Sequence, residues 1–99
     1  MILSNALQYA YNKLYIQLRK YLWDMDVVQQ IAYLEVETYK AIPDLLACSQ
    51  RFETLHTSIK DTAKEDEDLQ SAVKLFRDTL DSASDICCKL ESTREEVSQ

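Results

Sequence analysis

His56 is the only histidine among the 99 residues, so hypotheses about catalysis or metal binding start from it. Together with Glu53 it forms an E-x-x-H sequence, the spacing with which helical bundles hold di-iron and di-manganese centres. A complete centre of that type needs two such motifs and further carboxylates, and one copy of the chain has a single motif. A symmetric dimer would supply the second motif, with Glu35 as the extra carboxylate. A dimeric metal-binding bundle is therefore one hypothesis for the function.

Phosphoryl transfer through His56 is a second chemical hypothesis. Lys60 follows His56 by one helical turn, where its charge would steady a phosphoryl group on the imidazole. In this respect the chain resembles histidine phosphotransfer domains, whose signature has the lysine closer to the histidine and then a glycine. The sequence Ser58-Ile59-Lys60-Asp61 departs from that signature. It also puts a bulky residue where a response partner would approach.

The three cysteines add little further chemistry. Cys87 and Cys88 are adjacent and point about 100° apart on a helix, so they do not form the C-x-x-C arrangement of redox sites. A zinc site of Cys48, His56 and Cys87 would need a fourth ligand. The chain has no glycine, which removes phosphate-binding glycine loops and the EF-hand turn. We therefore expect no catalytic residues, no bound metal and no cofactor.

Composition indicates the scaffold that carries these residues. Glycine is absent and Pro43 is the single proline, which argues against a protein rich in tight β-hairpins. Good helix formers are plentiful, so we expect an all-α protein. The net charge of −6 arises after Pro43, where thirteen acidic residues face seven basic ones. An acidic surface repels nucleic-acid phosphates and favours a protein partner.

The sequence also bears on location. The first residues lack the basic segment and the long apolar core of a secretory signal, and no stretch is apolar enough to span a membrane. An odd number of cysteines without a framework spacing indicates reduced thiols. We therefore expect a cytoplasmic protein.

Helix boundaries are predicted from caps and from changes in the apolar pattern. Asp24 and Asp26 suit a helix N-cap, and Pro43 with Asp44 suits the start of a new helix. The charged run from Lys64 to Asp68 is either a turn or an exposed part of one long helix, and we favour the turn. The expected fold is one domain, 1–99, an antiparallel bundle of three to four helices at about 4–23, 27–41, 44–62 and 68–92, with 93–99 a frayed tail.

The predicted core follows two lines of apolar residues whose spacing alternates between three and four, as in a coiled coil. We call these positions the core seam. One line runs through the first helix and the other through the second half of the chain. Its members are Leu7, Tyr11, Leu14, Leu18, Tyr21, Phe52, Leu55, Ile59, Leu69, Val73, Phe76 and Leu80.

The first helix carries a second apolar line, which repeats every seven residues on the side opposite its seam. We call it the outer stripe: Ile2, Tyr9, Ile16 and Trp23. A helix that packs only within its own domain needs a single apolar face. Tyrosine and tryptophan are also favoured at interfaces. The outer stripe therefore predicts a non-enzymatic interaction module, an adaptor or chaperone-like escort, that docks a partner helix or forms a homo-oligomer.

Overall fold

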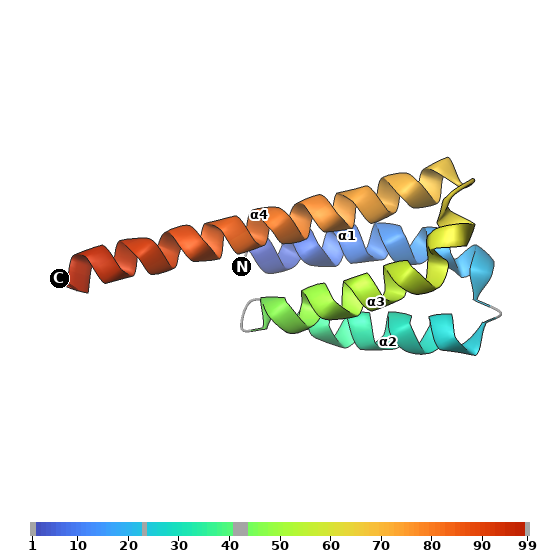
Figure 1. Cartoon of the computed structure of the whole chain (residues 1–99), viewed down its shortest axis with the longest axis horizontal. Coiled ribbons are helices and arrows are strands. Elements are labelled where there is room, and N and C mark those ends of the chain that lie inside the picture. The colour runs from blue at the N-terminus through green and yellow to red at the C-terminus, as the bar shows by residue number, and fades with distance from the viewer. Residues whose placement is uncertain (1, 23, 41–43, 99) are drawn as a thin grey trace.

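The computed structural model describes residues 2–22, 24–40 and 44–98, with side chains described from 5 to 87 within those ranges. Its elements are α1 (Ile2–Leu18), a 3₁₀ turn η1 (Arg19–Tyr21), α2 (Met25–Tyr39), α3 (Leu45–Ala63) and α4 (Glu67–Ser98). The described ranges contain no strand. The expected all-α fold is therefore confirmed, with four helices (Figure 1).

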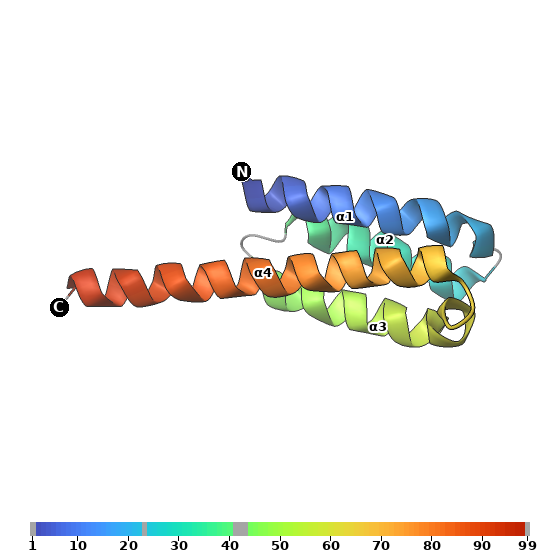
Figure 2. The same ribbon diagram turned by 90° about the horizontal axis from the view of Figure 1, so that it is seen from above.

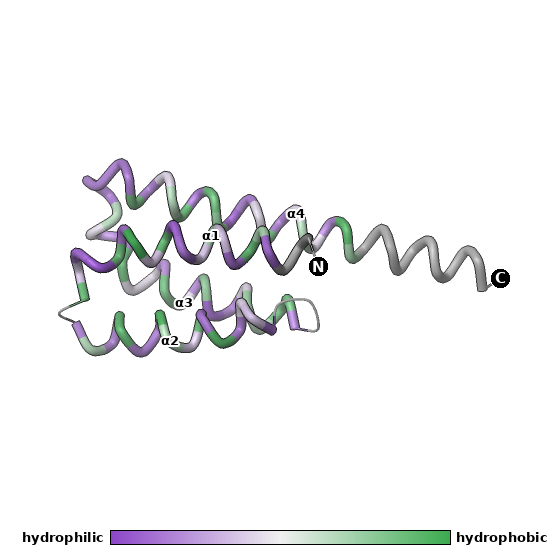
Figure 3. Tube along the Cα trace, turned by 180° about the vertical axis from the view of Figure 1, so that it is seen from behind, coloured by the Kyte–Doolittle hydropathy of each residue, from purple (hydrophilic) through white to green (hydrophobic). Residues whose placement is uncertain are grey.

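The helices run alternately up and down, and each lies beside two neighbours (Figures 1 and 2). The most extensive contacts join α1 to α4 and α2 to α3, while α1 with α2 and α3 with α4 form the other two sides. The arrangement is an antiparallel four-helix bundle. Figure 3 shows hydrophobic positions recurring along each helix among hydrophilic ones.

The core seam lies inside this bundle. Eleven of its twelve members are buried, and Tyr21 is half-buried at one end. The α2 helix contributes Val27, Ile31 and Leu34 to the same interior. Phe52 and Phe76 pack with ring centroids 4.8 Å apart, which joins α3 to α4.

The connections between helices are built by aspartate caps. Asp24 Oδ1 accepts from the Asp26 amide at 2.9 Å, and Asp44 Oδ1 accepts from the Ala47 amide at 3.2 Å. The chain turns between Ala63 and Glu67. The alternative in which the charged run from Lys64 to Asp68 continues one long helix is therefore excluded. The predicted role of Pro43 in a first helical turn lies outside the described residues.

Two of the expected helix boundaries were wrong. The first α-helix ends at Leu18 and not near 23, because η1 tightens the chain and Leu22 leaves the helical region at φ −82° and ψ 33°. The last helix continues to Ser98, past the expected end at 92, because no glycine or proline interrupts it. The end of α4 projects beyond the start of α1 (Figure 2).

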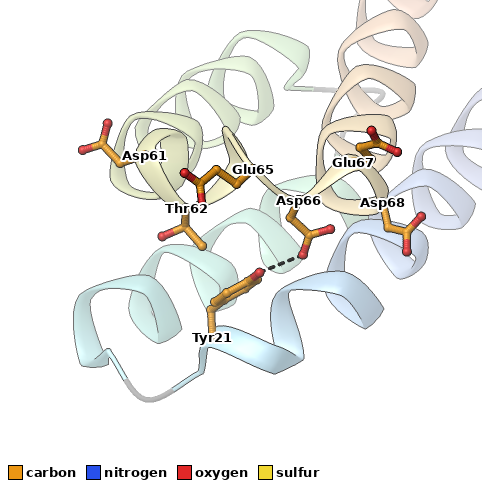
Figure 4. A pocket seen from close by; sticks show the side chains of 7 residues that line it. All are labelled: Tyr21, Asp61, Thr62, Glu65, Asp66, Glu67 and Asp68. Carbon is orange, nitrogen blue, oxygen red and sulfur yellow. Dashed lines mark hydrogen bonds between the residues drawn. The ribbon is translucent and has the colours of Figure 1, made fainter.

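Asp66 joins the first helix to the turn between α3 and α4. Its Oδ1 accepts from the Leu69 amide at 3.0 Å, which caps α4. Its Oδ2 accepts from the Tyr21 hydroxyl at 2.7 Å and from Lys20 Nζ at 3.1 Å. The hydrogen bond to Tyr21 appears in Figure 4. One carboxylate therefore starts α4 and fixes η1, which follows α1, beside it.

Because of these hydrogen bonds, the free energy of unfolding is expected to fall as the pH is lowered. Hydrogen bonds from Tyr21, from the Leu69 amide and from Lys20 lower the pKa of Asp66 from 3.8 to about 2. A depressed pKa gives stability that is complete above the unfolded value and is lost as the pH falls through the folded one. Asp66→Asn keeps a capping oxygen and removes the charge, so we expect it to unfold at a lower urea concentration than the wild type at neutral pH.

The gap between the two urea midpoints should shrink as the pH falls from about 4 to about 2. Asp81→Asn, which removes an exposed carboxylate from α4, is the matched control and should show no such gap. If the difference in urea midpoint between the wild type and Asp66→Asn stays constant across this pH range, the ionised Asp66 carboxylate does not stabilise the fold as assigned.

Candidate functional site

The outer stripe of α1 faces away from the bundle where the structure describes it. Tyr9 is 58% exposed and Ile16 is 54% exposed. The Lys13 ammonium lies 5.3 Å from the centre of the Tyr9 ring and leaves the ring accessible. Trp23 and the side chain of Ile2 lie outside the described residues. Two of the four predicted contact residues are therefore placed on an open surface.

Exposed apolar side chains are concentrated on α1 and α2. Seven of the ten large exposed ones in the described part of the chain belong to these two helices, against one on α3 and two on α4. They do not all share one side, because the Tyr33 ring centre lies 4.7 Å from the Arg51 guanidinium of α3, whereas Tyr15 lines a groove toward α2. The seven are Tyr9, Tyr15, Ile16, Met25, Tyr33, Val36 and Tyr39.

A groove of about 380 Å³ runs between α1 and α2. Tyr11 and Tyr15 form one wall, with their rings stacked at 6.2 Å between centroids. Val28, Ile31 and Ala32 supply apolar lining from α2. Val36 and Tyr39 follow Ala32 by about one and two helical turns, so they extend the same side of α2. We call the groove with these flanking residues the α1–α2 face.

The groove also has polar and charged lining residues, among them Asn12, Tyr11 and Glu35. Glu35 lines it as an exposed carboxylate. Burial, and then the nearby charge of Glu35, raise the pKa of Tyr11. Tyr11 therefore keeps its hydroxyl proton over the whole physiological range. The sequence pattern assigned Tyr11 to the core and did not show that its edge also borders this groove.

The E-x-x-H residues contact an arginine of the neighbouring helix. Arg77 Nη1 donates to Glu53 Oε1 at 2.7 Å, and Arg77 Nη2 lies 3.0 Å from His56 Nδ1. The guanidinium also lies 5.1 Å from the centre of the Phe52 ring. Glu53 and Arg77 are each about half exposed, so this ion pair contributes only roughly 0.2–1 kcal/mol. The motif thus joins α3 to α4.

His56 and Lys60, which the phosphotransfer hypothesis pairs, line one open groove between α3 and α4. Arginine has no acceptor, so Nδ1 of His56 accepts the hydrogen bond and the neutral ring carries its proton on Nε2. Glu35, the extra carboxylate of the metal hypothesis, lies in the α1–α2 groove and lines no pocket with His56. Within one copy of the chain, His56 and Lys60 therefore share a groove, whereas Glu35 lies in a different one.

Cys48 and Cys87 occupy different surroundings. Cys48 is fully buried, and its Sγ lies 3.9 Å from Thr38 Oγ1 across the α2–α3 contact. Burial raises the pKa of this thiol to about 11, which keeps it protonated and unreactive. Cys87 is a free, half-buried thiol on α4. In the described residues no cluster of three or more metal-ligating side chains is found.

Acidic side chains surround the turn between α3 and α4 (Figure 4). Asp61, Glu65, Glu67 and Asp68 line an open depression of about 630 Å³ there, beside Tyr21 and Asp66. This end therefore carries much of the negative charge that the sequence places after Pro43.

Comparison with known proteins gives no relative from which a role could be carried over. No protein-family model, no curated protein and no solved structure matches the chain. None of the helices in the described ranges combines the length and hydrophobicity needed to cross a bilayer. The case for function therefore depends on the surfaces described above.

The contact between Arg77 and His56 can be tested directly. Nitrogen NMR of the neutral imidazole should show the proton on Nε2, because Arg77 donates to Nδ1. Arg77→Leu should remove this constraint and shift the His56 signals toward those of a free tautomer mixture. Arg51→Leu removes an arginine that lies 4.7 Å from the Tyr33 ring, and it should leave His56 unchanged. A proton on Nδ1 in the wild type would contradict the assignment.

Proposed function

We propose that this protein is a non-enzymatic interaction module, of the adaptor or escort type, that docks a partner helix or a second copy of itself through the outer stripe of α1. The observation that carries this proposal is the exposure of Tyr9 and Ile16 on a helix whose other side fills the core. A helix without a partner needs only the buried side to be apolar.

The surroundings of the stripe support the proposal. The α1–α2 face continues the apolar surface onto a second helix, and its groove is lined by both apolar and polar side chains, a mixture that an amphipathic partner helix could contact. Tyrosines dominate the exposed set, and tyrosine contributes a large contact area while its hydroxyl remains hydrated. A protein partner in a reducing cytoplasm also agrees with free Cys48 and Cys87.

The test is a paired substitution on the stripe. Tyr9→Ala with Ile16→Glu removes one contact and places a charge at the other, at two exposed positions. We expect unchanged helical content by circular dichroism and at least ~10-fold weaker binding, measured as the loss of complexes larger than the 11.5 kDa single chain. The complexes are measured by light scattering on the pure protein and on material co-purified from its native cell.

Gln50→Glu is the matched control, because it adds the same charge at an exposed position of α3, which is not a neighbour of α1. It should leave every complex intact. If the paired variant keeps all complexes of the wild type, the outer stripe is not the contact surface. If it loses its helical content, the two side chains support the fold and the proposal fails.

A further inference from the structure

The groove between α3 and α4 gathers positive charge in a chain that is acidic as a whole. It is open and has a volume of about 470 Å³. Its basic lining residues are Lys60, Lys64, Lys74 and Arg77. Among the lining residues that the structure describes, only Asp61 is acidic. Acidic residues outnumber basic ones by 17 to 11 in the whole sequence, so this groove is a local exception.

Helical spacing places these groups along one side of each helix. His56, Lys60 and Lys64 follow one another at intervals of four along α3, and Lys74 and Arg77 are three residues apart on α4. At a rise of 1.5 Å per residue, the line on α3 is about 12 Å long. The positive charge therefore extends over a distance longer than a single phosphate group.

The lysines of the groove are available to a ligand. Lys60 and Lys64 are exposed, and neither takes part in an ion pair with the described residues. Lys74 Nζ lies 3.3 Å from Asp78 Oδ2, but the two side chains are 78% and 60% exposed. An ion pair this exposed is weak and exchanges readily with other partners.

Arg77 and His56 contribute donors whose orientation is already fixed. Arg77 donates to Glu53 Oε1 at 2.7 Å, and its guanidinium lies 5.1 Å from the centre of the Phe52 ring. Because Arg77 also donates to Nδ1 of His56, the neutral imidazole retains its proton on Nε2 as a further donor. Glu53 offsets the charge of Arg77, so the three lysines supply the excess positive charge of the groove.

We infer that this groove binds, without covalent chemistry, a small anion that carries two or more phosphate groups. Phosphate oxygens accept strong hydrogen bonds from ammonium and guanidinium groups. A compact ligand is favoured over a long polyanion, because Asp61, Glu65 and Glu67 line the adjoining turn and would repel further negative charge. The phosphates can belong to a free compound or to a lipid head group. This site is separate from the outer stripe and goes beyond the proposed function.

Inorganic tripolyphosphate is the probe for this site. At physiological ionic strength it should bind the full chain saturably in isothermal titration calorimetry, and it should shift the NMR signals of His56 and of backbone amides within 56–77. Lys60→Gln with Lys64→Gln removes two charges at exposed positions of the groove. We expect this paired variant to raise the dissociation constant at least ~10-fold.

The matched control is Lys13→Gln with Lys40→Gln, which removes the same charge at exposed positions outside the groove. It should change the dissociation constant much less, because charges more than about 8 Å away are largely screened at this ionic strength. Asp61→Asn removes the acidic lining residue and should lower the dissociation constant roughly 2-fold or more. Such a gain in affinity cannot arise from misfolding.

Phosphatidylcholine vesicles with and without phosphatidylinositol bisphosphate distinguish the two sources of phosphate. Co-sedimentation with the phosphorylated vesicles that is lost on Lys60→Gln with Lys64→Gln assigns the site to a lipid head group, whereas binding of tripolyphosphate alone assigns it to a free compound. The inference is overturned if neither probe binds saturably, or if the control variant weakens binding as much as the groove variant does. If the groove variant loses helical content, Asp61→Asn decides, and unchanged or weaker binding by that variant overturns the inference.

Discussion

Capping of helix N-termini by aspartate is the interaction on which the bundle depends. A chain without glycine cannot end its helices with the usual left-handed glycine cap, and no described residue has a positive φ. The helix starts are defined more firmly, because Asp24, Asp44 and Asp66 begin α2, α3 and α4 by accepting hydrogen bonds from backbone amides. These three carboxylates define where α2, α3 and α4 begin and satisfy backbone amides that have no partner within the helix.

Local pattern predicted most of this fold. The three-and-four spacing identified core positions from Leu7 to Leu80, because a helical period requires no knowledge of neighbours. Asp24 was recognisable as a cap, and the turn before Glu67 followed from a polar gap in the seam. The second role of Asp66 was not predictable, because Tyr21 and Lys20 lie far from it in sequence and only helix packing brings them together. The full length of α4 was missed because its polar end lacks the apolar spacing that marks a packed helix.

For the candidate sites as well, local spacing in the sequence did not identify the contacts that depend on a second helix. E-x-x-H is a local spacing, yet what it binds is decided by the facing helix, and α4 presents Arg77 between Glu53 and His56. The outer stripe was visible in sequence because it too is periodic along one helix. The groove beside it was not, since it exists only where α1 packs against α2 and Tyr11 stacks on Tyr15. A surface that is formed by two packed helices cannot be predicted from the apolar periodicity of either helix alone.

The two helix pairs differ in the chemistry of their exposed side chains. Among the described side chains, the exposed surfaces of α3 and α4 consist mostly of charged and polar residues, with Leu46, Leu75 and Ile86 as the large apolar exceptions. The α1–α2 pair exposes tyrosines, whose hydroxyls stay hydrated in the free chain while their rings retain apolar area that a contact would remove from water. Leucine at the same positions would expose apolar area without a hydrated group, and lysine would place a charge there. A surface of this composition is compatible both with a free chain and with a bound one, which agrees with the proposed interaction module.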